Sequence, residues 1–238
     1  MEATQSMDDL QVKSINGIYN VSFKELNLRY FSTKDHIVYV VDHKVLDLHE
    51  DKFSDIKRQN LIIVKTKEKN KSLKYVTKII EDLQKFGANR GTTLVCIGGG
   101  IVQDLCCFVA QIYMRGIKWI FCPTTLLSQA DSCIGSKSSL NFSFVKNLIG
   151  SFYAPSEVII DTSFLSTLPN HEIESGVGEI YKIFLISDYK LKRKLEISDF
   201  KDTSLAISLI KKALHAKKLI IEADEFDSST RLVMNYGH

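Results

Sequence analysis

The chain has 238 residues, of which 45% are hydrophobic and 25% are charged, as in an ordinary globular protein that buries a sizeable core. Its formal net charge of +3 is too mild to predict nucleic-acid binding. No apolar stretch approaches the ~18 residues that a membrane-spanning helix needs, which excludes such a span. The length allows one large domain or two small ones.

Targeting and cysteine content favour the cytoplasm. Residues 1–12 lack both the basic and the apolar segment of a secretory signal. The cysteines are odd in number and none forms a C-x-x-C pair, which is typical of reduced, buried thiols. They are Cys96, Cys106, Cys107, Cys122 and Cys133.

The first third of the chain alternates between strand and helix patterns. Residues 1–14 are expected to form a loose leader. Runs rich in β-branched and aromatic residues predict strands at residues 17–23, 37–41 and 61–64. Residues 72–86 repeat apolar side chains at helical spacing and predict a helix.

A glycine turn follows the next strand. The apolar run at residues 94–97 predicts a buried strand, three glycines end it, and residues 105–113 predict a helix. Such a unit can cradle a phosphate, because backbone N–H groups at the helix start point toward the anion. A dinucleotide fingerprint would need its third glycine at Gln103, so a simple tight turn is an equally good interpretation of this stretch.

The remaining elements set the fold class. Strands are predicted at residues 117–122 and 158–161, and helices at residues 172–186 and 204–222. Alternating strands and helices predict an α/β fold with a parallel, Rossmann-like sheet, followed by the start of an α-helical domain. We place the boundary at residue 168, giving a nucleotide-binding domain at 1–168 and an incomplete helical domain for metal and substrate at 169–238. In such sheets ligands sit at the carboxyl ends of the strands.

Several long motifs carry a family resemblance. They read GGGIVQD, YMRG, PTTLLSQADSCIGSKSSLN, KNLIGSFYAP and GEIYKIF, and they occur in this order between about residue 41 and residue 238. In order and spacing they resemble 3-dehydroquinate synthase and the wider sugar-phosphate cyclase family. Some positions depart from the usual motifs, including Gln103 in place of a glycine and Ser136 in the GGKTG segment. These departures alter the walls of the expected site but remove none of its charged residues.

The resemblance implies a carbon–oxygen lyase that uses NAD and Zn²⁺ (or Co²⁺). Its substrate would be a small phosphorylated keto acid, 3-deoxy-arabino-heptulosonate 7-phosphate, converted to 3-dehydroquinate and phosphate in the shikimate pathway of aromatic amino acid biosynthesis. The full-length protein would be a cytoplasmic homodimer without nucleic-acid or membrane partners. The alternatives are another sugar-phosphate cyclase, a metal-dependent polyol dehydrogenase of similar fold, or a catalytically dead truncated relative.

The resemblance also assigns a nucleotide site. Asp42 follows a predicted strand, where a carboxylate can accept hydrogen bonds from ribose hydroxyls. Asp104 falls in the first turn of a helix, where it could equally well complement the helix dipole. The residues matched to the cofactor site are Asp42, Glu68, Lys71, Gly98, Gly99, Gly100, Asp104, Thr124, Thr125, Leu127, Lys146, Phe164 and Thr167.

Two residues match metal ligands of the family, Glu179 and His238. One glutamate and two histidines with an open position form a catalytic zinc site. The third ligand would be a later histidine, and His36, His43, His49, His171 and His215 do not match it. We therefore expect the sequence to be a fragment that is catalytically inactive by itself.

A third group matches the substrate site. It comprises Arg115, Asp131, Lys137, Asn147, Lys182, Lys217, Arg231 and Asn235. Arginine and lysine suit a small polyanion, the first as a fork and the second as a point charge. Lys217 falls in the middle of an apolar helix face, where an ammonium is costly unless it is paired, functional or able to snorkel to water. We expect Lys217→Met to fold normally and to lose activity.

Overall fold

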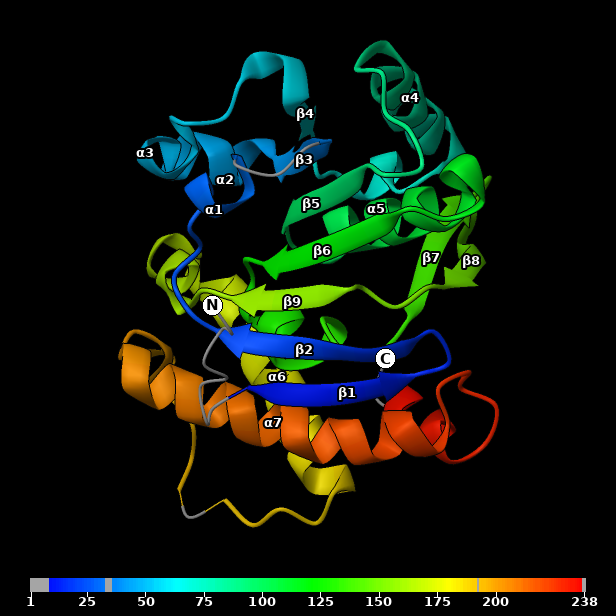
Figure 1. Cartoon of the computed structure of the whole chain (residues 1–238). Coiled ribbons are helices and arrows are strands. Elements are labelled where there is room, and N and C mark those ends of the chain that lie inside the picture. The colour runs from blue at the N-terminus through cyan, green and yellow to red at the C-terminus, as the bar shows by residue number, and fades with distance from the viewer. Residues whose placement is uncertain (1–8, 33–35, 192, 237–238) are drawn as a thin grey trace.

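A seven-stranded sheet forms the centre of the molecule (Figure 1), and the computed structural model describes residues 9–32, 36–191 and 193–236. The strand order is β1-β2-β9-β6-β5-β3-β4, with every neighbouring pair parallel except β1 and β2. In that order the strands are Leu10–Ser14, Gly17–Phe23, Glu157–Ile160, Lys118–Pro123, Thr93–Gly98, Ile37–Asp42 and Leu61–Val64. This arrangement confirms the predicted α/β class.

Helices cover both faces of the sheet, because alternate residues of each strand point to opposite sides. In β3, Val38 and Val40 belong to one apolar cluster, and Tyr39 and Val41 belong to another. The first cluster contains residues of α4 (Leu73–Lys85), α5 (Gly100–Ile112), α6 (Asn170–Ile186) and α7 (Thr203–Ala223). The second contains residues of α1 (Arg29–Ser32), α2 (His43–Leu48), α3 (Glu50–Phe53) and the 3₁₀ turn η5 (Thr162–Thr167).

The expected loose leader is wrong for residues 10–14, which form the edge strand β1. Leu10 and Val12 are buried and lie opposite Val21 and Tyr19 of β2. The alternation of buried and exposed side chains in β1 is only five residues long, and most of these five residues are polar. Its stability comes from pairing with β2 across a short turn, which a local pattern does not reveal.

Two further features differ from the predictions. Helix α5 begins at Gly100, five residues before the predicted start at residue 105, so the glycine turn is itself the helix N-terminus. A separate hairpin, β7 (Lys137–Phe142) with β8 (Val145–Phe152), packs beside α5 and was not predicted.

The short helical turns are η1 (Arg58–Asn60), η2 (Glu68–Asn70), η3 (Tyr113–Arg115), the π turn η4 (Ser128–Ser132), η6 (Ile197–Phe200) and η7 (Thr230–Asn235).

The C-terminal helices share the core of the sheet. Buried residues of α6 and α7 belong to the same apolar cluster as α4 and α5, and α7 lies along β1 (Figure 1). The domain boundary at residue 168 stays a prediction. Among the described helices, none combines the length and the apolar character that crossing a membrane requires.

Candidate active site

The first cleft lies at the carboxyl ends of β3, β5 and β6 and has a volume of about 580 Å³. Most of the residues predicted to bind the cofactor line it, although they come from segments far apart in the chain. They are Asp42, Glu68, Lys71, Gly99, Gly100, Asp104, Thr124, Thr125, Leu127, Phe164 and Thr167. The structure therefore gathers these predicted residues around one space.

Glycine occupies the three positions of the turn for different structural reasons. A Cβ at Gly98 would overlap Val102, and one at Gly99 would lie 2.9 Å from Cγ2 of Thr125, so both positions need glycine for close packing. A Cβ at Gly100 would meet nothing within 4 Å, and Gly100 lines the cleft. Gly99 has no side chain to cap α5, which leaves the first backbone N–H groups of the helix suited to an anion.

Asp42 is the N-cap of α2 as well as a cleft residue. Its Oδ1 accepts a hydrogen bond from Lys44 N at 3.0 Å. The hydroxyl of Thr66 contacts both carboxylate oxygens, at 3.0 and 2.9 Å. Asp42 therefore also stabilises the turn between β3 and α2, as aspartates at strand ends often do.

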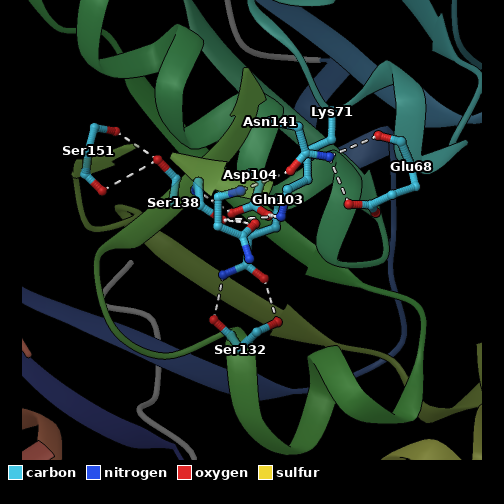
Figure 2. A network of polar contacts seen from close by, with 10 residues as sticks. Glu68, Lys71, Gln103, Asp104, Ser132, Ser138, Asn141 and Ser151 are labelled. Carbon is cyan, nitrogen blue, oxygen red and sulfur yellow. Dashed lines mark hydrogen bonds and ion pairs between the residues drawn. The ribbon is translucent and has the colours of Figure 1, made fainter. Parts of the chain in front are cut away.

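A polar network connects the first cleft with the β7–β8 hairpin (Figure 2). Lys71 Nζ lies 2.7 Å from Asp104 Oδ2 and donates to Ser139 Oγ at 3.1 Å. The backbone N–H of Ser139 donates to Asp104 Oδ1 at 2.8 Å. Burial raises the pKa of Asp104 above its usual value, against the opposing effect of Lys71. The expected place of Asp104 in the first turn of the helix is wrong, because α5 begins at Gly100 and its first turn contains no acidic residue. Asp104 is instead a structural anchor in the cleft wall.

Two side chains extend this network on either side. Asn141 Nδ2 donates to Glu68 Oε1 at 2.8 Å (Figure 2). Gln103, the residue that replaces a usual glycine, donates from Nε2 to the carbonyl of Ser132, and Ser132 Oγ donates back to Gln103 Oε1 at 2.6 Å. The first turn of α5 thus holds the π turn η4 in place.

The second cleft has a volume of about 270 Å³ and is rich in charge. The predicted residues that line it are Asp131, Lys137, Glu179, Lys182, Lys217, Arg231 and Asn235. Ser139 lines it too, and because Ser139 contacts Asp104 and Lys71 of the first cleft, the two clefts adjoin.

Each lysine of the second cleft lies against a carboxylate. Lys217 Nζ is 2.7 Å from Asp131 Oδ1 and Lys137 Nζ is 2.5 Å from Asp227 Oδ2. Lys182 Nζ lies 2.5 Å from Glu179 Oε1. The cleft is therefore a set of close ion pairs that a polyanionic ligand could rearrange.

Lys217 is paired rather than snorkelling. Only 5% of the residue is exposed, and its ammonium also donates to the backbone carbonyl of Asp131 at 2.7 Å. Pairing therefore accounts for the ammonium on this apolar face, and the functional role expected for Lys217 stays a prediction.

The structure describes part of the expected metal site. Glu179 Oε1 is buried and makes no aligned hydrogen bond, although it forms the ion pair with Lys182. His238 lies outside the described residues. Within the described part of the chain, no three histidine, cysteine or acidic side chains converge on one point. The described residues therefore offer one carboxylate that suits a cation, and the donor set is incomplete without His238.

Four predicted site residues line neither cleft. Arg115 follows the C-terminus of α5. This helix has 13 residues, so at the helical rise per residue its two ends are about 20 Å apart, and Arg115 lies far from Gly100. Asn147 accepts a hydrogen bond from Ser139 Oγ at 2.9 Å, next to the second cleft. Lys146 precedes it on β8, and Gly98 is the last residue of β5. Their assignments stay predictions.

Several residues that line the clefts carry no signal in the sequence. Asp227 lies in the loop after α7, where no motif or periodicity singles out one acid among several. His49, set aside as ordinary, lines the first cleft with its Nε2 2.8 Å from Thr167 Oγ1. Burial lowers the pKa of His49, with a further contribution from Lys52. His49 is the C-cap of α2, and no motif in the sequence distinguishes it from the other histidines.

Comparisons with known proteins agree with this geometry. The family model for the 3-dehydroquinate synthase N-terminal region matches residues 61–175, and the model for its C-terminal region matches residues 176–238. The 3-dehydroquinate synthase of Dictyoglomus thermophilum is 42% identical over 205 residues, covering 84% of this chain and 58% of the relative. The chain thus spans less than two thirds of that relative's length.

Two further comparisons extend over nearly the whole chain. The 3-dehydroquinate synthase of Campylobacter concisus is 35% identical over 233 residues, covering 97% of this chain and 67% of the relative. A crystal structure of 2-deoxy-scyllo-inosose synthase with carbaglucose-6-phosphate, NAD⁺ and Co²⁺ is 26% identical, with a TM-score of 0.82 over 97% of this chain and 66% of that chain. Sequence, family models and fold agree: the chain belongs to the 3-dehydroquinate synthase family.

Proposed function

We propose that this chain carries the nucleotide and substrate sites of a 3-dehydroquinate synthase, which converts 3-deoxy-arabino-heptulosonate 7-phosphate to 3-dehydroquinate and phosphate. One observation carries the proposal: a lysine-rich cleft adjoins a cleft built on an uncapped, glycine-started helix. A phosphorylated keto acid and a dinucleotide have the charges that these two clefts suit.

NAD fits the first cleft. Its volume is within the usual range for cofactor sites, and Gly100 leaves room for a pyrophosphate beside the first N–H groups of α5. Asp42 would accept hydrogen bonds from ribose hydroxyls, with its carboxylate held in place by Thr66 and Lys44. Bound NAD would supply a reversible hydride acceptor for one ring hydroxyl.

A divalent metal is proposed for the second cleft. Glu179 would supply a carboxylate oxygen and His238 a ring nitrogen, and Zn²⁺ or Co²⁺ would polarise the hydroxyl that is oxidised. Lys182, whose Nζ lies 2.5 Å from Glu179 Oε1, lines the same cleft and would supply a positive charge beside the bound substrate.

The remaining charged side chains would hold the substrate. As the resemblance implies, Lys217 and Arg231 would bind the carboxylate, and Lys137, Asn147 and Asn235 the phosphate. Arg115 belongs to the same predicted phosphate group, although it lines neither cleft. Arg231 is suited to a planar carboxylate, because its buried guanidinium is already oriented by a hydrogen bond to the carbonyl of Glu225 at 2.6 Å. These contacts would fix the substrate against the cofactor and exclude water.

Two alternatives make different demands on the same clefts. A polyol dehydrogenase would accumulate NADH and would have no use for a phosphate-binding lysine cluster. Another sugar-phosphate cyclase would use the lysine cluster to bind phosphate. If its substrate had no carboxylate, it would not need Lys217 and Arg231 to bind one. The presence of both basic residues in the cleft favours the synthase.

Phosphate release tests this assignment. A chimaera that joins this chain to the part of the Dictyoglomus thermophilum relative beyond the matched segment is supplied with NAD, Zn²⁺ and the keto-acid phosphate. We expect phosphate release without net NADH. Growth of NADH absorbance with a polyol, and no phosphate release, would support the dehydrogenase instead.

Assembly and location complete the proposal. The five cysteines are free and buried, which suits a reducing compartment such as the cytoplasm. We propose a homodimer for the full-length protein, which sedimentation equilibrium would test.

A further inference from the structure

The loop after α7 is folded into a fixed shape by one carboxylate. Asp224 accepts hydrogen bonds from the backbone N–H groups of Ser228, Ser229 and Arg231 and from two serine hydroxyls. These hydrogen bonds, led by the one from Ser228, hold the pKa of Asp224 well below its usual range, so the carboxylate remains ionised and the loop remains closed. The loop therefore presents its central residue in a defined position.

That central residue is Asp227, and it points into the second cleft. Its backbone φ of 57° lies in the left-handed region, which aspartate tolerates better than most residues. Its side chain is 8% exposed, and Oδ2 lies 2.5 Å from Lys137 Nζ. Asn235 Nδ2 lies 3.3 Å from the same oxygen. Asp227 thus contacts two residues assigned above to the substrate phosphate.

The neighbourhood of the loop prevents Asp227 from simply moving away. Glu225 accepts hydrogen bonds from Ser14 Oγ at 2.6 Å and from the N–H of Ile15 at 2.7 Å, both in the β1–β2 hairpin. Its backbone carbonyl accepts the hydrogen bond from Arg231. The loop is therefore fastened to the sheet edge on one side and to the cleft wall on the other.

Burial alone would raise the pKa of Asp227, but the hydrogen bonds from Lys137 and Asn235 outweigh burial and lower it. The carboxylate is therefore charged at neutral pH and is an anion in the place where an incoming phosphate would find its cation. Two anions at one ammonium repel each other, so a phosphate must displace Asp227 or be bound more weakly.

We propose that Asp227 is a resident counter-ion of the phosphate site, which holds Lys137 and Asn235 in position when the cleft is empty and competes with the phosphate group for them. This inference rests on the proposed function, because that function places the phosphate at Lys137. Its consequence is a phosphate affinity lower than the cation cluster alone would give, which favours release of the phosphate product. Asp227 thus sets how tightly the site holds a phosphate group.

Calorimetric titration with inorganic phosphate tests the proposal. The proteins are the 238-residue chain, Asp227→Asn and Asp227→Ser, each checked for folding by its melting temperature. We expect both variants to bind phosphate about tenfold more tightly, since the competing charge is gone while Lys137 remains. Glu225→Gln is the matched control: it removes one negative charge from the same loop at a residue without a contact to Lys137, and its affinity should equal that of the parent chain.

Lys137→Met separates the two claims. If it abolishes phosphate binding while the Asp227 variants bind no more tightly than the parent, the counter-ion inference is overturned and the phosphate site stands. An equal gain in Glu225→Gln would also overturn the inference, because general charge would then explain the effect. If no protein binds phosphate, or Lys137→Met leaves the affinity unchanged, the placement of phosphate in the proposed function is itself wrong.

Discussion

Lys217 shows how far a single residue can be interpreted from its helix face. The sequence places an ammonium among apolar neighbours, and this position predicts that the ammonium is paired or functional. The partner, Asp131, lies 86 residues away along the chain, on a π turn that no local pattern reveals. The need for a partner could be predicted, but its identity depended on tertiary structure.

The pairing revises the expectation that Lys217→Met folds normally. Removal of the ammonium leaves Asp131 as a buried carboxylate without its cation, so we expect a loss of about 3 kcal/mol in the free energy of unfolding. Urea denaturation measures this loss. The double variant Lys217→Met/Asp131→Asn should recover part of it, because no unpaired charge remains. Equal unfolding midpoints for the parent and Lys217→Met would show that the pair contributes nothing.

Asp227 is a residue that the sequence could not single out. It is one of three acids in the loop that begins at Asp224, and the others serve as a loop anchor and as a hairpin contact. Only the fold distinguishes the acid that points into the cleft from the two that hold the loop. Residue types in a loop carry less positional information than those in a periodic helix or strand.

At the scale of elements, Asp161 joins three segments at the carboxyl end of β9. Its carboxylate accepts from Leu26 N at 3.0 Å and from Ser163 N at 2.9 Å, and it lies 3.1 Å from Lys52 Nζ. Burial alone would raise the pKa of Asp161, but these hydrogen bonds and the lysine lower it overall. The ionised form is therefore the one that stabilises the fold.

The direction of the pH effect follows from that lowered pKa. The stabilisation is fully present above the unfolded-state pKa of about 3.9 and is lost as the pH falls through the lower folded-state value. We expect the free energy of unfolding to fall below about pH 4, and to fall less steeply in Asp161→Asn. Urea unfolding at a series of acidic pH values measures both slopes. Parallel curves for the two proteins would show that Asp161 is not a source of the acid sensitivity.

The β1–β2 hairpin is an element whose role appears only in the fold. Tyr19 is buried, and its hydroxyl accepts a hydrogen bond from the N–H of Gly135 at 2.9 Å. Gly135 has a φ of 100° and precedes the cleft residue Lys137. The edge hairpin therefore supports the turn that leads into β7.

Tyr19→Phe tests this support. The variant leaves the buried N–H of Gly135 without a partner, so we expect a loss of about 1–2 kcal/mol in the free energy of unfolding. Tyr236→Phe, at a side chain that is largely exposed, should leave stability unchanged. Thermal and urea unfolding of the parent chain and the two variants measure these differences. A Tyr19→Phe variant as stable as the parent would show that the hydrogen bond to Gly135 does not stabilise the fold.

Prediction from sequence was most successful where elements are long or fully buried. The strands β3, β5 and β6 are continuous apolar runs, and α4 and α7 have strong helical periodicity, so each was predicted within about two residues. The hairpin β7–β8 was missed because β8 is mostly exposed and its pattern is irregular. Its strands are defined by their mutual pairing and by Leu140 beneath them.

At the scale of the whole molecule, the N-terminal part of α5, from Gly100 to Asp104, connects the two clefts. Its backbone starts the helix at the first cleft, Asp104 binds Lys71 and Ser139, and Gln103 holds Ser132 in the wall of the second cleft. The sequence predicted the glycine turn and the charged residues, and the fold brings them together at one edge of the sheet. The central claim is that this edge binds a dinucleotide beside a polyanion.

Titration of NAD⁺ into the 238-residue chain, compared with Gly100→Val, tests that claim most directly. A Cβ at Gly100 meets no protein atom within 4 Å, and a valine side chain there would intrude where the pyrophosphate would lie, so we expect folding to be kept and affinity to fall by about tenfold or more. Gly178→Val is the matched control, since a Cβ there also meets nothing and Gly178 lies outside the cleft. Binding by the parent chain and by Gly178→Val, with loss in Gly100→Val, is the predicted result. No binding by the parent chain, or equal affinity in all three proteins, would contradict the account.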